Sequence, residues 1–200
     1  MKIIAHRGAS IEHPENTIEA IKKAFDHNVH AVEIDVHLTL DGVPVVIHDE
    51  TLERTHNDKR KVSECLAKEL PIPTLKEVLD LTRECLLIIE LKEGPNNEKL
   101  VEKVTELAKD HSNIVIASFN QNMLSQVKGF EIMGLSETAE EIPPFEWVAL
   151  DHNIIDRALM KTLNGRRVWT YTLDDTEKAK ELKDIGVEGF ITNDPRNFLK

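Results

Sequence analysis

The chain has 200 residues, of which 40% are hydrophobic, and its 25 basic and 36 acidic side chains give a formal net charge of −11. This length suits a single domain with a substantial core, and the acidic balance argues against a nucleic-acid partner, which needs a basic surface. The sequence has neither a signal-peptide core nor an apolar run of about 18 residues, so we expect a cytoplasmic protein without stable membrane insertion. Oligomeric state cannot be predicted from the sequence.

Short apolar runs alternate with amphipathic stretches along most of the chain. Strands are predicted over 2–5, 31–35, 86–91, 114–118, 130–134, 147–150, 167–172 and 188–192. Helices are predicted over 17–28, 74–84, 97–110, 121–128, 154–164 and 175–184, with a weak helix at 136–142 and a truncated one after Pro195. Strand–helix alternation indicates parallel βα units, and eight of them favour an α/β fold of the closed (β/α)8 barrel type, in one domain over 1–200. An open doubly wound sheet is the alternative.

One short insertion, at about 36–73, interrupts this alternation after the second strand. It opens as a hairpin around Asp41-Gly42. A tight two-residue turn there would pair residues 39 with 44, 37 with 46 and 35 with 48, which places His48 beside Asp35. The polar stretch 51–70 has no clear core stripe, and we expect it to cross one end of the fold. Cys65 and Cys85 allow one disulfide but form no CxxC pair.

Three carboxylates stand at the carboxyl ends of the second and third strands, where barrel enzymes carry their chemistry. Glu33 and Asp35 are two residues apart and share one face of a strand, and Glu90 ends an apolar run. Three such groups need a counter-charge near neutral pH. One interpretation is a divalent cation bound by oxygens, Mg²⁺ or Ca²⁺. The other is ion pairing with Arg7, Lys92 or surface lysines.

Two histidines stand near these acids. His6 ends the first strand and His48 ends the hairpin, so both are candidates for general acid–base catalysis, whereas the other histidines are expected to be ordinary. Arg7 and Lys92 would bind an anion such as phosphate, or pair with the carboxylates. Phe119 and Trp169 are candidates for a pocket wall, although such aromatic residues more often belong to the core.

These residues fall within motifs that resemble the glycerophosphodiester phosphodiesterase family over nearly the whole chain. The motifs, in order, are His6-Arg7-Gly8, Glu15-Asn16-Thr17, Glu33-Ile34-Asp35, Val45–Asp49, Thr51–Thr55, Ile72–Leu75, Glu90-Leu91-Lys92, Ser118-Phe119, Trp169-Thr170 and Gly186–Pro195. Each motif is weak alone, but their order and spacing are specific. Two departures, a short insertion and Tyr171-Thr172-Leu173 after Trp169-Thr170, concern which alcohol or lipid group is recognised.

The resemblance implies a TIM barrel that hydrolyses small glycerophosphodiesters to glycerol 3-phosphate and an alcohol. It implies a divalent metal on Glu33, Asp35 and Glu90, acid–base catalysis by His6 and His48, and phosphate contacts from Arg7 and Lys92. Two alternatives are a lysophospholipase D acting on lipids and a catalytically silent barrel that binds phosphorylated metabolites. A silent barrel is expected to have lost a histidine or a metal-binding acid, and this chain keeps all five.

Overall fold

The computed structural model describes residues 1–81 and 85–199. Within these ranges eight parallel strands form the barrel: β1 (Lys2–His6), β2 (Ala31–Leu38), β4 (Leu86–Leu91), β5 (Ile114–Ser118), β6 (Glu131–Ser136), β7 (Trp147–Asp151), β8 (Arg167–Tyr171) and β9 (Gly189–Thr192). Each strand pairs with the next, and β1 pairs with both β2 and β9, which closes the sheet. The predicted (β/α)8 TIM barrel is therefore confirmed, and the open sheet is excluded.

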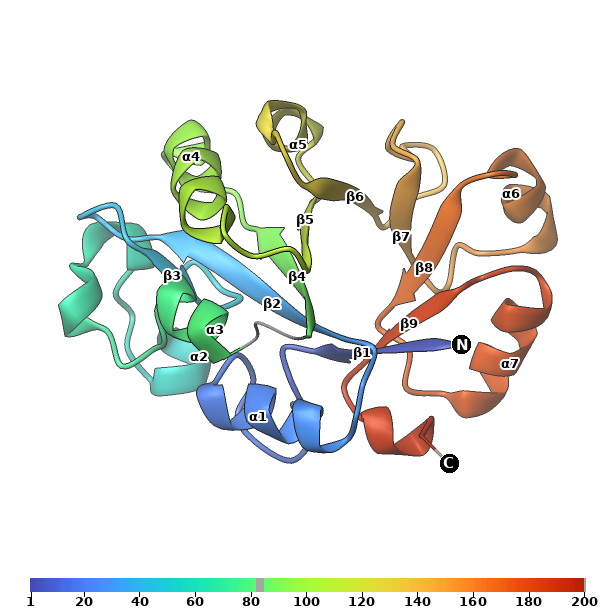
Figure 1. Ribbon diagram of the computed structural model, residues 1–200, viewed down its shortest axis with the longest axis horizontal. Helices are drawn as coiled ribbons and strands as arrows, with labels where there is room; N and C mark the ends of the chain where they lie inside the picture. Colours follow the sequence, from blue (N-terminus) through green and yellow to red (C-terminus); the bar gives the residue numbers. More distant parts are fainter. Residues whose placement is uncertain (82–84, 200) are drawn as a thin grey trace.

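Helices surround the strands (Figure 1). They are α1 (Ile18–Asp26), α3 (Leu75–Leu81), α4 (Asn97–Ala108), α5 (Gln121–Gln126), α6 (Arg157–Thr162) and α7 (Thr176–Asp184). Several begin at a polar side chain that accepts hydrogen bonds from the first turn, as Thr17 does for α1 and Asp175 for α7. The predicted end of the helix over 74–84 lies outside the described residues.

Two weakly predicted helices differ from the structure. The segment expected to be helical at 136–142 forms bends and turns between β6 and β7, because it lacks an apolar stripe and runs into Pro143-Pro144. After Pro195 the chain forms only the 3₁₀ turn η3 (Pro195–Asn197), and Lys200 lies outside the described residues.

The strands bury both of their faces, as continuous apolar runs require. Outward side chains pack against the helices, whereas inward ones such as Ile4, Ala31 and Ile88 fill the barrel interior. Because side chains alternate along a strand, the next inward positions on these three strands are His6, Glu33 and Glu90. The interior therefore changes from apolar to charged toward the carboxyl ends of β1, β2 and β4.

The predicted hairpin exists, but its predicted register is wrong by one residue. In the structure β3 (Pro44–Val46) runs antiparallel to β2, with Val36 opposite Val46 and Leu38 opposite Pro44. The connection is a three-residue turn in which Thr39 N donates to Val43 O at 3.1 Å and Gly42 takes a left-handed conformation at φ 78°. Asp35 O consequently accepts from Ile47 N at 3.0 Å. The residue opposite Asp35 is therefore Ile47, and His48 lies one position further along the chain.

The rest of the insertion is more ordered than its polar sequence suggested. It contains α2 (Glu53–His56) and the 3₁₀ turns η1 (Val62–Glu64) and η2 (Ala67–Glu69). A small separate core holds these pieces under the hairpin, formed by Val45, Ile47, Leu52, Val62, Cys65 and Leu70. Those beyond the hairpin, Leu52, Val62, Cys65 and Leu70, follow no regular helical or strand period, which is why the sequence pattern did not reveal this core. Cys65 and Cys85 are both free thiols.

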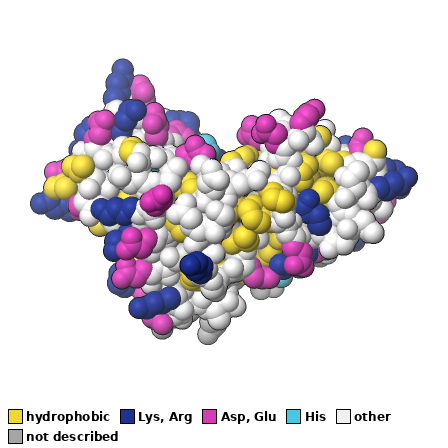
Figure 2. Space-filling view, turned by 90° about the horizontal axis from the view of Figure 1, so that it is seen from above, with side chains coloured by type: hydrophobic (Ala, Val, Ile, Leu, Met, Phe, Trp, Pro, Cys, Tyr) yellow, Lys and Arg dark blue, Asp and Glu magenta, His cyan; other side chains and the backbone are white. Residues whose placement is uncertain are grey.

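The surface agrees with the acidic composition. On the face drawn in Figure 2, basic side chains are interspersed with acidic ones, and a hydrophobic area lies between two raised parts of the molecule. Among the helices of the described residues, none is long and apolar enough to cross a membrane.

Candidate active site

A cavity of about 390 Å³ opens beside the carboxyl ends of the barrel strands. Its walls include most of the ionisable residues singled out in the sequence, namely His6, Arg7, Glu33, His48, Glu90 and Lys92. The strand register explains this convergence, because His6 lies next to Glu33 across β1 and β2, and Asp35 lies next to Glu90 across β2 and β4. Asp35 is wholly buried and contacts Arg7 and Lys92.

The tight loop after β1 carries Arg7. Arg7 and Gly8 both have left-handed backbone conformations, at φ 56° and 80°. A side chain at Gly8 would meet the backbone of Ala20 in α1 at 2.6 Å, so glycine is required there. The Arg7 N–H donates to Glu33 Oε2 at 3.0 Å, and its guanidinium lies 3.1 Å from Asp35 Oδ2.

The two cations neutralise part of the acidic cluster. Lys92 Nζ lies 2.5 Å from Glu90 Oε1 and 3.0 Å from Asp35 Oδ1. Asn16, in the loop before α1, donates to Asp35 Oδ2 at 2.8 Å. Ion pairing, the second of the two sequence-based interpretations, is therefore present for Asp35 and Glu90. Glu33 differs, because its buried Oε1 has no hydrogen-bond partner among residues 1–81 and 85–199.

The carboxylates have unequal proton affinities. Burial, reinforced by Asp35 and Glu90, raises the pKa of Glu33 well above its usual value. Burial and the charge of Asp35 raise the pKa of Glu90 to about 7. For Asp35, burial acts upward as well, but Lys92 and Arg7 outweigh it and hold the pKa of this carboxyl below its usual range. Asp35 is thus the fixed negative charge of the site, and the other two acids favour a further cation.

The acidic cluster fits a divalent metal ion. One oxygen from each of Glu33, Asp35 and Glu90 lies within 4.8 Å of the others. A donor set made only of carboxylate oxygens suits hard cations such as Mg²⁺ or Ca²⁺. The unpartnered Oε1 of Glu33 provides a buried ligand atom that no protein group satisfies in the described chain.

The His6 ring is fixed by a neutral partner. Its Nδ1 lies 2.8 Å from Asn193 Oδ1, and its Nε2 faces Glu33 Oε2 at 3.9 Å. The amide of Asn193 is oriented in turn by Asp174, which accepts from Asn193 Nδ2 and from its backbone N–H, each at 2.8 Å. The amide therefore presents its oxygen to His6, which must donate from Nδ1. Burial and the nearby charge of Arg7 lower the pKa of His6 to about 4.

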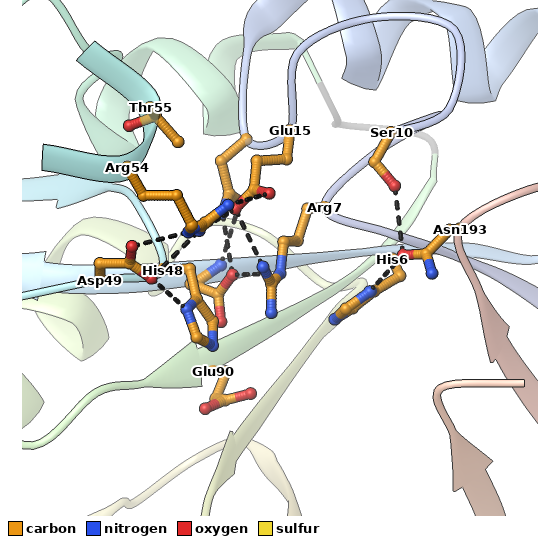
Figure 3. Close-up of polar contacts among 12 residues, drawn as sticks. His6, Arg7, Ser10, Glu15, His48, Asp49, Arg54, Thr55, Glu90 and Asn193 are labelled. Atoms are coloured by element: carbon orange, nitrogen blue, oxygen red, sulfur yellow. Dashed lines mark hydrogen bonds and ion pairs between the residues drawn. The ribbon is translucent and has the colours of Figure 1, made fainter. Parts of the chain in front are cut away.

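The His48 ring has a charged partner instead. Its Nδ1 lies 2.6 Å from Asp49 Oδ1, and its other ring nitrogen points toward Glu90 (Figure 3). The backbone carbonyl of His48 lies 3.0 Å from His37 Nε2 on β2, which ties the end of the hairpin to the barrel. Arg54 contacts both oxygens of Asp49, and its hydrogen bonds lower the pKa of that carboxyl to about 2.

Of the two aromatic residues predicted for the pocket wall, the structure places one at the cavity. Phe119 lines the cavity and is 40% exposed. Trp169 does not line this cavity: it is fully buried in the barrel interior, in edge contact with Trp147 at 4.6 Å. Tyr171, two residues further along β8, lines the cavity instead and packs edge-on against Phe119 at 5.9 Å. Tyr171 ends β8 beside the cavity, whereas Trp169 lies in the middle of the same strand, so Tyr171 forms the wall in place of Trp169.

Sequence reasoning did not assign the residues that orient the predicted ones. These are Asn16, Asp49, Arg54, Asp174 and Asn193. The sequence position of two of them could have indicated a role at the site, since Asn193 directly follows the last strand and Asp49 directly follows His48. Asp174 and Arg54 act on neighbours that only the fold brings together.

Known proteins of one enzyme class resemble this chain in sequence and in fold. The model of the glycerophosphoryl diester phosphodiesterase family matches residues 6–149. A glycerophosphodiester phosphodiesterase of Caldanaerobacter subterraneus is 32% identical, over 98% of this chain and 96% of the relative. The crystal structure of a glycerophosphodiester phosphodiesterase from Thermotoga maritima is 26% identical, with a TM-score of 0.88 over 98% of this chain and 96% of that one.

A phosphodiesterase of Oleispira antarctica, solved in complex with the product sn-glycerol-3-phosphate, shares the same fold with a TM-score of 0.90 at 24% identity, over 98% of this chain and 94% of that one. The family match contains the barrel strands β2, β4, β5 and β6 in full, and both candidate histidines. The chain therefore belongs to the glycerophosphoryl diester phosphodiesterase family, and it is an enzyme of that class.

Proposed function

We propose that this enzyme hydrolyses glycerophosphodiesters to glycerol 3-phosphate and an alcohol, with a divalent metal on Glu33, Asp35 and Glu90 and with His6 and His48 as the proton-transfer pair. The observation that carries the proposal is the shared cavity, in which two histidines and two cations surround a three-carboxylate cluster. The Oleispira relative, whose structure holds sn-glycerol-3-phosphate, supports the product.

A phosphodiester is an anion, so its charge must be neutralised before a nucleophile attacks. Bound to the three carboxylates, the metal would act as a Lewis acid on a phosphoryl oxygen. Arg7 and Lys92 supply fixed positive charge for the other non-bridging oxygens and for the charge that develops in the transition state. Both cations are already held by acids of the site, and this preorganisation avoids a reorientation cost during the reaction.

The partners of the two histidines support different roles for them. His6 has a neutral partner and a pKa lowered to about 4, so its Nε2 is free of a proton near pH 7 and accepts one from the nucleophile. His48 is held at Nδ1 by the carboxylate of Asp49 and turns its Nε2 toward Glu90, so we assign it the donation of a proton from Nε2 to the leaving oxygen. The attacking group is water or the glycerol 2-hydroxyl, and the latter would give a cyclic phosphate.

The choice of leaving group tests these roles. The protonating histidine matters little for a diester whose leaving group is a p-nitrophenolate. His48→Ala should therefore lose about 10²–10⁴-fold in kcat/KM with an alkyl leaving group and regain most of it with the aryl one. His6→Ala should stay defective with both. The reverse pattern would exchange the two roles, and full activity of both variants would refute the pair.

Longer lipids are a second candidate substrate, because Phe119 places an exposed hydrophobic side chain at the cavity. The enzyme should be assayed on glycerophosphocholine, glycerophosphoethanolamine and the matching lysophospholipids, with glycerol 3-phosphate and lysophosphatidic acid as the measured products. We expect higher kcat/KM on the water-soluble diesters. Faster cleavage of lysophospholipids would favour the lipid activity, and the absence of any product would contradict the proposed hydrolysis. The cytoplasmic location stays a prediction, to be checked by cell fractionation.

A further inference from the structure

A chain of ion pairs links His48 to Arg7, two residues that line the cavity. It runs from His48 through Asp49, Arg54 and Glu15 to Arg7 (Figure 3). We propose that Arg54, which does not line the cavity, is a positioning residue that fixes the orientation of the His48 ring through Asp49. The inference rests on the proposed function, in which His48 transfers a proton.

Arg54 leaves Asp49 little freedom to turn. Its Nε donates to Asp49 Oδ2 at 2.7 Å, and its Nη2 donates to Asp49 Oδ1 at 3.0 Å. The same Oδ1 lies 2.6 Å from His48 Nδ1. A carboxylate held at both oxygens presents one lone pair to the imidazole ring in a fixed direction. The ring therefore carries a proton on Nδ1, which faces this lone pair, and its Nε2 points toward the cavity.

The side of the Arg54 guanidinium that faces away from Asp49 is held by Glu15. Arg54 Nη1 and Nη2 donate to Glu15 Oε2 and Oε1, each at 2.7 Å. Glu15 Oε1 also accepts from Arg7 Nη1 at 2.9 Å. Arg54 thus forms two forked pairs in one plane, a geometry that the single ammonium of a lysine cannot reproduce.

Fold stability does not account for this arrangement. Arg54 lies on the four-residue helix α2, which has no buried residue, and its side chain is 47% exposed. The insertion is held by its own apolar cluster, to which Arg54 does not belong. Exposed ion pairs generally stabilise a fold very little. Here the pairs end on two groups of the cavity wall, His48 and Arg7, where orientation decides the rate.

The chain contains a matched control in the same insertion. Arg60 is 49% exposed and forms a forked pair with Asp58, at 2.8 and 2.6 Å to Oδ2. Neither residue lines the cavity, and the pair is local to the loop. Arg60→Gln therefore removes a similar exposed guanidinium and a similar ion pair without touching the site.

The test compares Arg54→Gln and Arg54→Lys with Arg60→Gln, using glycerophosphocholine and thermal melting as a check of folding. A ring displaced by about 1 Å loses roughly 10²-fold in rate, so we expect kcat of Arg54→Gln to fall about 10- to 100-fold. KM should stay within about threefold, because Arg7 keeps Glu15 and Asp35 as partners. Arg54→Lys should recover only a small part of kcat. Arg60→Gln should match the wild type.

Two kinetic results would overturn the proposal. One is a kcat of Arg54→Gln within twofold of Arg60→Gln. The other is full recovery in Arg54→Lys, which would reduce the role of Arg54 to its charge.

A spectroscopic measurement keeps this proposal separate from the proposed function. Nitrogen-15 NMR of the imidazoles reports which ring nitrogen carries the proton. The neutral form of His48, which lacks the proton that Nε2 would donate, should keep its proton on Nδ1 in the wild type and in Arg60→Gln, and should show mixed tautomers in Arg54→Gln. If the wild type hydrolyses no glycerophosphodiester, the proposed function fails while this spectrum still tests the positioning. A wild-type His48 protonated only on Nε2, or a spectrum unchanged in Arg54→Gln, would refute the positioning role.

Discussion

Replacement of Lys92 by methionine tests whether this side chain is the internal counter-charge of the acidic cluster. Methionine keeps the length of the side chain but removes the ammonium, which lies 3.0 Å from Asp35 and 2.5 Å from Glu90. Lys92, Glu90 and Asp35 are only 15%, 12% and 1% exposed at their side chains, so solvent replaces little of the lost charge. Removing one partner of a buried pair costs about 3–5 kcal/mol.

Two features of the site reduce that cost. Arg7 still lies 3.1 Å from Asp35. Glu90 already has a pKa of about 7 and takes up a proton when Lys92 is absent. We therefore expect the lower end of the range, about 3 kcal/mol at pH 8 and less at pH 6. For a protein of this size that corresponds to a fall in Tm of roughly 6–12 °C.

The assay is thermal unfolding in chelator and then in millimolar Mg²⁺ or Ca²⁺. The metal should raise the Tm of Lys92→Met more than that of the wild type, because the ammonium no longer competes for the carboxylates. Lys76→Met removes an exposed ion pair with Asp80 and should melt with the wild type. A Lys92→Met variant that melts within 1 °C of the wild type in chelator at pH 8 would refute the reasoning.

Three further predictions concern the same site. The pKa of Glu90 is raised from its ordinary 4.5 to about 7 in the folded protein, so its contribution to stability is present below pH 4.5 and is lost as pH rises through 7. In chelator, denaturant titrations should show this loss, about 3 kcal/mol, in the wild type but not in Glu90→Gln, and equal pH dependence in both would contradict it. His48→Ala and Glu90→Ala should fold, as judged by circular dichroism, yet lose activity; wild-type turnover in His48→Ala would contradict its assignment. Arg7→Lys cannot keep both Glu15 and Asp35, so KM should rise about tenfold with a smaller change in kcat, and an unchanged KM would argue against a phosphate contact.

The barrel was predictable because its signals are local and repeated. Runs such as Leu86–Leu91 indicate strands buried on both faces, and their alternation with helices favours a barrel over an open sheet. Strand ends are where such barrels carry chemistry, so the sequence positions of His6, Glu33 and Glu90 were enough to group these residues in one site. The family motifs then supplied the role expected of each residue.

The parts that were wrong depend on geometry that the sequence expresses weakly. Gly42 is compatible with a two-residue or a three-residue turn, and the difference moves the register of His48 by one. Trp169 and Tyr171 both point to the barrel interior, and their positions along β8 decide their roles. Trp169, in the middle of the strand, belongs to the core, and Tyr171, at its end, lines the cavity. The link between Arg54 and Glu15 joins residues 39 positions apart, and no local pattern encodes it.

The most direct test of the central claim is the release of glycerol 3-phosphate from glycerophosphocholine, measured with and without chelator in the wild type and in His6→Ala and His48→Ala. We predict release that chelator abolishes, that Mg²⁺ or Ca²⁺ restores, and that falls about 10²–10⁴-fold in either histidine variant. Full activity in chelator would contradict the metal site on Glu33, Asp35 and Glu90. Wild-type release by either histidine variant would contradict the proton-transfer pair.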